Sequence, residues 1–323
     1  MNMLKKWANR IFIDGLTGMA HGLFATLIIG TIIQQIGNLI GGDIGNYIFL
    51  IGKVAAALTG AGIGVGVAYR FKESPMVVLS ASSAGMIGAF ASKILEGTIM
   101  DGASTVVLAG PGEPLGAFLA AYIGIEIGHL VAGKTKVDIL VPPLVTILIG
   151  VGVAALVAGP IGTAANAVGK AIMWATELHP FLMGIVVSVL VGIALTLPIS
   201  SAAICASFGL VGLAGGAAVA GCCAQMIGFA VMSFRENRWG GLVAQGLGTS
   251  MLQMPNIVKN PRIWIPPTLA SAITGPLATC LFKLKMNGAA VNSGMGTCGL
   301  CGQIGVWTGW LNPSEAALKA GET

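Results

Sequence analysis

Long apolar stretches separated by short polar gaps run along most of the sequence. Many of them approach the roughly 20 residues that a helix needs to cross the hydrocarbon core of a bilayer. Several gaps contain basic residues, such as Arg70 with Lys72 and Lys134 with Lys136, which is typical of the cytoplasmic ends of spans. The pattern predicts an all-α, polytopic helical membrane protein with about ten transmembrane helices.

Residues 1–43 are predicted to hold an interfacial helix and the first span. From Met1 to Asp14, apolar residues recur at helical spacing while basic residues such as Arg10 occupy other positions, a pattern typical of an amphipathic helix at a membrane surface. The basic charge predicts a cytoplasmic amino terminus, so the span from Gly18 to Ile36 would run outward. We expect the carboxyl terminus to be cytoplasmic as well.

Proline-containing motifs recur along the chain and indicate an internal duplication. Ser74-Pro75-Met76 aligns with Leu197-Pro198-Ile199, and Val141-Pro142-Pro143 aligns with Ile265-Pro266-Pro267 at the same offset to within one residue. Duplicated halves are a common design of helical transporters, with the substrate site where the repeats meet.

The duplication divides the rest of the chain into three predicted parts. Residues 44–160 form the first transmembrane repeat, residues 161–284 form the second, and residues 285–323 form a last span with a short polar tail. Basic residues follow corresponding segments of both repeats, so the repeats share one orientation.

Two re-entrant hairpins follow from that shared orientation. Five complete crossings in each repeat would place the basic loops of the second repeat outside the cell. One segment per repeat must therefore enter and leave the membrane on the same side. The segments Glu113–Val131 and Gln245–Asn256 are flanked by helix-breaking residues and contain polar side chains, as such a hairpin requires.

Composition agrees with the membrane class. Of 323 residues, 55% are hydrophobic and only 9% are charged, and the mean hydropathy is +0.88. The 49 glycines suit helices that pack closely through small residues. The net charge of +5 arises mainly from basic residues between apolar runs, so we attribute it to topology and expect no nucleic-acid partner.

Several kinds of site are not expected. The amino terminus lacks the pattern of a removable signal peptide, and the cysteines lie in apolar surroundings that disfavour a disulfide framework. Cys298 and Cys301 have the spacing of half a zinc site but lack a second pair, so we expect a packing face and no metal. We predict no cofactor and no catalytic residue.

A helix break from Thr196 to Gly209 interrupts apolar sequence with a proline, hydroxyls and very small residues. In lipid such a break survives where it lines a cavity, because freed backbone groups need partners. Ser200 and Ser201, with Ser82 and Ser83 at the corresponding place in the first repeat, are therefore candidate ligands. Alternatively, these hydroxyls bond back to carbonyls of their own helices.

Glu113, Glu126 and His129 are candidate substrate ligands on the first predicted hairpin, because carboxylates bind hydroxyls through charge-assisted bonds and intramembrane ionisable groups are costly. The alternative is a hairpin tip whose charged groups are hydrated at the membrane surface. Gln253 and Asn256 are the matching amide ligands on the second hairpin, since amides both donate and accept.

Two segments resemble a known family. They are the run GTSMLQMPNIVKNPRIWIPP, which spans Gly248 to Pro267, and the run Leu197-Pro198-Ile199-Ser200-Ser201. The chain resembles the membrane subunit, enzyme IIC, of the bacterial phosphotransferase system, in the branch that includes perfringolysin-regulator proteins. The resemblance implies a duplicated plasma-membrane transporter, usually a homodimer, with re-entrant hairpins around a sugar site. Glu113 is the nearest match to the family's hairpin glutamate, which binds the sugar hydroxyl that receives phosphate.

We therefore expect a membrane transporter of a sugar or a related small polar solute. This sequence contains no soluble IIA or IIB domain, so phosphorylation would require separate IIA and IIB proteins, and the chain would be at most the membrane component of a phosphotransferase. One alternative is a cation-coupled carrier of an organic acid or another small solute. Another is a membrane sensor that regulates gene expression through a partner.

Overall fold

The structure, a computed structural model, describes residues 3–101, 105–108 and 110–321. It is almost entirely helical, with a small antiparallel sheet in which β1 (Met100–Asp101) pairs with β2 (Thr105–Val106). The chain divides into two compact units, Met1–Thr163 and Ala164–Thr323, which are described separately below. A long helix, α9 (Val141–Thr176), carries the chain from one unit into the next.

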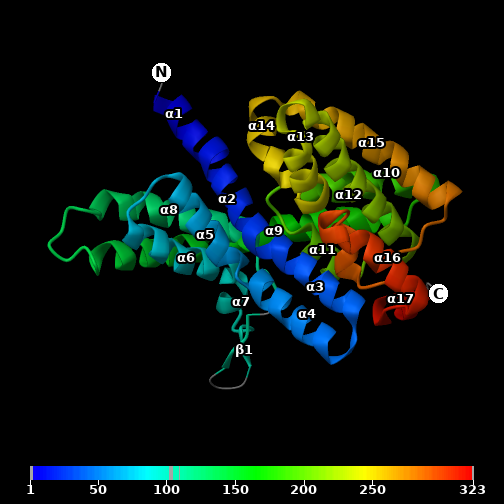
Figure 1. Ribbon diagram of the computed structural model, residues 1–323, viewed down its shortest axis with the longest axis horizontal. Helices are drawn as coiled ribbons and strands as arrows, with labels where there is room; N and C mark the ends of the chain where they lie inside the picture. The colour runs from blue at the N-terminus through cyan, green and yellow to red at the C-terminus, as the bar shows by residue number, and fades with distance from the viewer. Residues whose placement is uncertain (1–2, 102–104, 109, 322–323) are drawn as a thin grey trace. The chain divides into compact units, whose positions relative to one another are not determined.

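The first unit begins with an uninterrupted helical run, followed by a hairpin of helices. The run consists of α1 (Met3–Asn9), η1 (Arg10–Gly15), α2 (Leu16–Leu23), η2 (Phe24–Ile28) and α3 (Ile29–Ile40). The remaining helices before α9 are α4 (Gly42–Ala57), α5 (Thr59–Arg70), α6 (Pro75–Ala89), α7 (Ala91–Leu95) and α8 (Pro114–Val131). Figure 1 shows α4 returning beside α3. Gly41 and Gly42, with φ of +66° and +61°, make this reversal in a conformation that glycine adopts without strain.

Glycines set the spacing of the helices in the first unit. A Cβ added to Gly22 on α2 would collide with the backbone of Gly62 on α5, and one on Gly66 would collide with Gly18. Gly64 meets Ala81 of α6 in the same way. Small residues thus let α2, α5 and α6 approach to backbone contact, which replaces the aqueous hydrophobic effect as the source of helix association in lipid.

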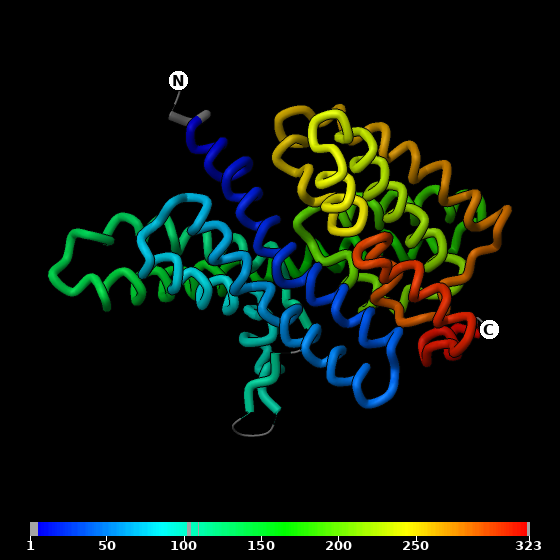
Figure 2. The backbone as a smooth tube through the Cα atoms, in the orientation of Figure 1, coloured from blue at the N-terminus to red at the C-terminus, as the bar shows by residue number. Residues whose placement is uncertain are grey.

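The second unit is built on three mutually packed helices, α10 (Pro180–Thr196), α12 (Gly212–Met232) and α15 (Ile265–Pro276). Between α10 and α12 lies α11 (Ser201–Ser207). The segment between α12 and α15 consists of α13 (Phe234–Val243), η3 (Ala244–Gly248), η4 (Ser250–Gln253), α14 (Met254–Lys259) and η5 (Pro261–Trp264). After α15 come η6 (Leu277–Leu281), η7 (Ala290–Gly294), η8 (Cys298–Leu300), α16 (Cys301–Leu311) and α17 (Glu315–Lys319). The tube in Figure 2 follows the same path.

Two buried serines join the three central helices of the second unit. The hydroxyl of Ser188 on α10 donates to the carbonyl of Ser271 on α15 at 2.7 Å, and the hydroxyl of Ser271 donates to the carbonyl of Gly221 on α12 at 3.0 Å. Both side chains are fully buried. Interhelical hydrogen bonds of this kind fix helix positions where apolar burial gives little driving force.

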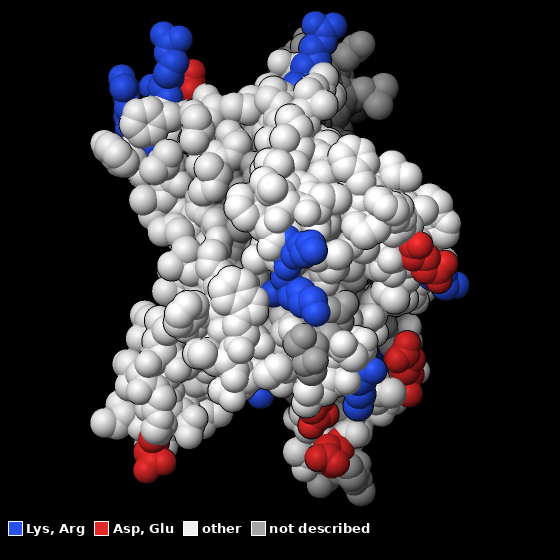
Figure 3. Space-filling model, turned by 90° about the vertical axis from the view of Figure 1, so that its right-hand side faces the viewer, with Lys and Arg blue, Asp and Glu red and all other residues white. Residues whose placement is uncertain are grey.

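Helices long and apolar enough to cross a membrane identify an all-α membrane protein. Within the described residues four pass this test, Lys6–Ile40, Pro114–Val131, Val141–Thr176 and Gly212–Met232, and a fifth results if α4 and α5, bent by 49°, count as one span. On the face drawn in Figure 3, large areas carry no charged side chain. The predicted number of about ten spans, the two re-entrant hairpins and the duplication stay predictions.

Three local expectations differ from the structure. The interfacial helix is not separate from the first span, because Lys6–Ile40 is one helical run. Asp14, which was expected to end the interfacial helix, instead pairs with Arg70 on α5 at 3.0 Å. Nor does the chain break at Ser82 and Ser83, which lie inside α6; Pro75 is instead the first residue of that helix, a position where its missing N–H costs nothing.

The first predicted hairpin segment, Glu113–Val131, contains one helix and no internal break, and its passage into the membrane stays a prediction. The residues from Pro114 to Val131 form the continuous helix α8. The sequence of α8 contains no proline after its first position, and its glycines pack against neighbours, as Gly116 does against Gly88 and Gly124 against Thr146. The glycines within α8 are therefore contact points between helices.

Candidate functional site

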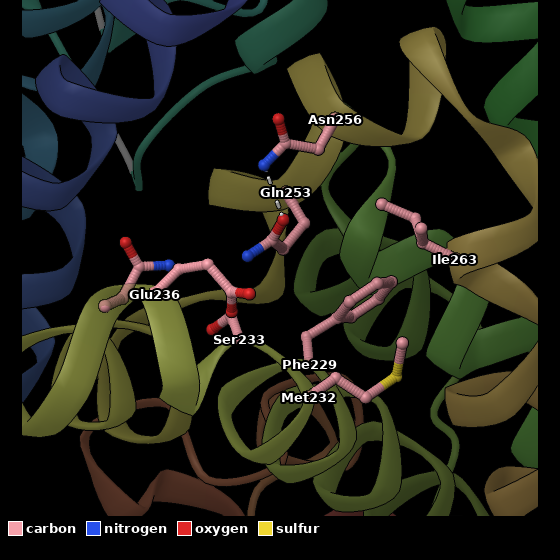
Figure 4. Close-up of a pocket in the computed structure, with 8 residues that line it drawn as sticks. Phe229, Met232, Ser233, Glu236, Gln253, Asn256 and Ile263 are labelled. Atoms are coloured by element: carbon pink, nitrogen blue, oxygen red, sulfur yellow. Dashed lines mark hydrogen bonds between the residues drawn. The ribbon is translucent and has the colours of Figure 1, made fainter.

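A pocket of about 340 Å³ with polar and apolar walls lies in the second unit between the end of α12 and the segment that follows it. It is lined by Phe229, Met232, Ser233, Glu236, Asn237, Gln253, Asn256 and Ile263. Figure 4 shows Ser233 and Glu236 on one side, Gln253 and Asn256 on another, and the apolar side chains of Phe229, Met232 and Ile263 completing the wall. The pocket thus combines one carboxylate with amides and an apolar surface.

Short helical turns between α13 and α15 bring these side chains together. The backbone is extended at Thr249, with φ of −158° and ψ of 142°, and the Thr249 hydroxyl accepts a hydrogen bond from the N–H of Met251 to start η4. A second interruption at Asn260 begins η5, where the Asn260 side chain accepts from the N–H of Arg262. This broken backbone is what the sequence indicated for Gln245–Asn256, although its passage into the membrane stays a prediction.

A chain of hydrogen bonds fixes the amides of the pocket. The Asn256 amide donates to Gln253 Oε1 at 2.9 Å, the Gln253 amide donates to Gln245 Oε1 at 2.9 Å, and the Gln245 amide donates to the Ser233 hydroxyl at 2.8 Å. Gln245 is 3% exposed and Gln253 is 6% exposed, whereas Asn256, at the end of the chain, is exposed. Connected polar networks of this kind hold their members in one orientation, so Asn256 is presented to the pocket in a defined geometry.

Further buried polar contacts hold the broken segment against the central helices. The hydroxyls of Thr196, at the end of α10, and Ser250, in η4, share a hydrogen bond of 2.8 Å and are both fully buried. Gln225 of α12 accepts from the Trp264 indole at 3.2 Å and donates to Thr268 at 3.2 Å. The predicted helix break after Thr196 therefore lies directly against the segment that forms the pocket.

Several charged residues are close in sequence to the residues that line the pocket. Glu236 contributes the carboxylate of the lining. Four exposed basic residues lie within three positions of a lining residue along the chain: Arg235, Arg238, Lys259 and Arg262. Arg238 interrupts α13 with a φ of +52°, which turns the chain beside Asn237.

The serines at the α10–α11 break have structural partners. The Ser200 hydroxyl accepts from the N–H of Ala203 at 3.2 Å and begins α11, as an N-cap residue does. The Ser201 hydroxyl is buried and donates to the carbonyl of Gly294 at 2.8 Å. In the first unit, Ser82 donates to the carbonyl of Leu79 in its own helix, and Ser83 is exposed. A ligand role for the four serines stays a prediction.

The structure separates Glu113 from the other two charged candidates of the first unit. Glu113 precedes the first residue of α8, and its N–H donates to the carbonyl of Ala89 at 2.7 Å. Glu126 and His129 lie near the far end of the same helix. At 1.5 Å per residue, Glu113 and Glu126 are about 20 Å apart along the helix axis, so they do not form one site.

Glu126 and His129 belong to an ion-pair network. The guanidinium of Arg10 donates to Glu126 and, at 3.2 Å, to Glu73, whose other carboxylate oxygen lies 2.8 Å from Nδ1 of His129. The Glu73 side chain is only 3% exposed. The arginine also stacks on Phe71, with its central carbon 4.1 Å from the ring centroid. This network ties the amino-terminal helix to α8, and a substrate role for Glu126 and His129 stays a prediction.

Comparison with known proteins identifies the family. The model of the phosphotransferase system EIIC family matches residues 13–318, nearly the whole chain. The chain belongs to the phosphotransferase system EIIC family. No curated protein and no solved structure matched it. As an EIIC protein with several membrane-length helices, it is a membrane component of a phosphotransferase transport system.

Within this EIIC protein, sequence reasoning found two of the pocket residues, Gln253 and Asn256, because their amides lie in a segment of helix breakers. It missed Ser233 and Glu236. Glu236 lies between Arg235 and Arg238 in a short polar gap, a setting in which basic residues are typical of the cytoplasmic end of a span. The available signal for a binding residue was the carboxylate of Glu236, which lies just after the polar end of an apolar run.

Proposed function

We propose that the pocket between Phe229 and Ile263 binds the sugar that this EIIC protein carries across the membrane. The observation that supports this proposal is the chain of fixed amides beside Glu236. A volume of about 340 Å³ falls in the range of small-molecule sites, roughly 300–1,000 Å³.

The chemistry of the lining suits a neutral polyol. Each sugar hydroxyl can donate one hydrogen bond and accept others, so it pairs with a carboxylate and with an amide. A bond from a hydroxyl to Glu236 would be charge-assisted and therefore the stronger one. Phe229, Met232 and Ile263 would contact the C–H faces of the ring. Alternating access would move such a site from one side of the membrane to the other.

Coupling to phosphorylation would use a separate soluble donor of the IIB kind, itself supplied by a IIA protein. The exposed side chains of Arg235, Arg238, Lys259 and Arg262 offer a phosphorylated protein complementary charge. A sugar-binding role for Glu113, in the first unit, stays a separate prediction. We further propose a homodimer in the bacterial plasma membrane with both termini in the cytoplasm.

Equilibrium binding to the purified protein tests the site. A panel of hexoses, hexitols and disaccharides would be titrated by calorimetry, and the sugar that binds would be titrated again with Glu236→Gln. Loss of a hydrogen bond to a charged group predicts affinity weaker by about 10-fold to 100-fold. Glu96→Gln, which removes an exposed carboxylate in the first unit, serves as the matched control. Unchanged affinity in Glu236→Gln would reject the pocket as the sugar site.

Transport assays distinguish the coupling mechanisms. Proteoliposomes containing the protein would be supplied with the bound sugar, with and without a phosphorylated IIB protein. The proposal predicts accumulation of sugar phosphate only when the donor is present. Accumulation of free sugar that depends on an ion gradient would instead indicate a cation-coupled carrier. Binding without any translocation would indicate a sensor.

A further inference from the structure

A second, apolar groove lies in the second unit and shares no lining residue with the sugar pocket. It consists of two adjoining hollows of about 310 and 430 Å³, which share Ala220, Leu284 and Trp310 as walls. Trp307 lines the first hollow, and Phe282 with Lys283 lines the second. The groove therefore runs between α12, the end of η6 and α16.

The polar side chains in the groove wall already have partners. The Gln303 amide donates to the sulfur of Cys223 at 3.2 Å, and the Thr274 hydroxyl donates to the carbonyl of Ser271 at 3.3 Å. The wall thus presents hydrocarbon and aromatic surface and few hydrogen-bonding groups. A sugar would form few hydrogen bonds in this groove. An acyl chain that moved into it from the bilayer would exchange one set of apolar contacts for another.

Basic residues lie beside the tryptophans of this groove. The apolar helix formed by α15 and η6 ends at Leu281, and Phe282, Lys283 and Lys285 follow it. The indole N–H of Trp310 donates to the carbonyl of Lys285 at 3.1 Å, which fixes the ring where the lysines emerge. Trp307 and Trp310 are 60% and 57% exposed. Tryptophan beside lysine at the end of an apolar helix is typical of the membrane–water interface.

We propose that this groove binds an anionic phospholipid. One acyl chain lies along Ala220, Leu284 and Trp310, and the phosphate contacts the ammonium group of Lys283, while Lys285, two positions further along the chain, adds positive charge nearby. The positive charge at the end of an apolar groove favours an anionic headgroup over a zwitterionic one, and the lysine stems can lie along the hydrocarbon while their charges reach the headgroup. Lys283 has a φ of +47°, an uncommon conformation for a residue other than glycine, and it is this turn that brings the side chain to the groove.

Tryptophan quenching by brominated lipids tests the proposal. The protein in mixed micelles would be titrated with brominated phosphatidylglycerol and, separately, with brominated phosphatidylcholine. We expect phosphatidylglycerol to quench at lower concentration, and the double substitution Trp307→Phe with Trp310→Phe to remove most of the saturable quenching. The double substitution Lys283→Gln with Lys285→Gln should reduce the preference for phosphatidylglycerol by about 25-fold, about fivefold for each lysine.

The chain offers a matched control in another loop, where Lys134 and Lys136 have the same spacing as Lys283 and Lys285. Lys134→Gln with Lys136→Gln should leave the preference unchanged. Ala220→Leu narrows both hollows and should weaken the binding of both lipids while sugar binding, as a check of folding, is retained.

Several outcomes would overturn the proposal. Equal quenching of the unmodified protein by the two lipids would show that the headgroup is not recognised. If the preference for phosphatidylglycerol survives replacement of Lys283 and Lys285, these lysines do not recognise the headgroup. The same conclusion follows if the Lys134 and Lys136 control variant loses the preference equally. Native mass spectrometry of the same samples should show bound phosphatidylglycerol. The spectra could instead show a dimer without bound lipid. If dissociation of that dimer exposes Trp310 to quenching, a second copy of the chain occupies the groove.

Discussion

Removal of Gln253 would break the hydrogen-bond chain of the pocket at its centre. The Gln253 side chain accepts from Asn256 and donates to Gln245, each at 2.9 Å. In Gln253→Leu, Gln245 Oε1 would lose its donor, although Gln245 is only 3% exposed. A buried polar group left without a partner costs about 1–3 kcal/mol. We therefore expect the free energy of unfolding to fall by about 2 kcal/mol.

The same substitution should weaken sugar binding, because Asn256 would no longer be held toward the pocket. Urea titration in mixed micelles would measure the unfolding free energy, and calorimetry would measure the affinity for the sugar found in the panel. Asn166→Leu, at an exposed amide on α9, is the matched control and should change stability by less than about 0.5 kcal/mol. A Gln253→Leu protein with unchanged stability and affinity would refute the account of the amide chain.

Three further predictions concern the first unit and the loop that follows α8. Arg10→Ala should destabilise the protein by about 2 kcal/mol, measured by the same urea titration, because it leaves Glu126 without its cation; adding Glu126→Gln should restore part of the loss. Gly22→Val should cost about 1–3 kcal/mol because the added carbons collide with α5, whereas Gly152→Ala, in open space, should not destabilise. Hydrogen bonds from the Thr135 hydroxyl and nearby backbone N–H groups lower the pKa of Asp138. The order of that loop should therefore be complete above the ordinary carboxyl pKa and lost as the pH falls through the lowered value, which amide exchange would detect.

Composition and the lengths of the apolar runs were sufficient to predict an all-α membrane protein, since a helix satisfies its backbone within lipid and few other structures do. They could not predict where a helix continues through polar residues. Asp14 looked like the end of a helix, but it pairs with Arg70, 56 residues away along the chain. A partner so distant in the sequence gives no local signal.

The candidate site was predictable only where its residues form a local pattern in the sequence. Gln253 and Asn256 lie among helix breakers, which is a local pattern. Glu126 was a candidate only because it is a carboxylate in an apolar run, and its partner Arg10 comes from a helix far away in the sequence. Whether a charged residue binds a ligand or pairs with another side chain depends on tertiary packing, which has no local pattern in the sequence.

Photo-crosslinking of the bound sugar tests the central claim most directly. A photoactivatable analogue of the sugar identified by calorimetry would be irradiated with the protein, and the labelled peptides would be found by mass spectrometry, with excess unmodified sugar as competitor. The account predicts competed labelling between Phe229 and Ile263. Labelling confined to the segment around Glu113, with none between Phe229 and Ile263, would contradict it.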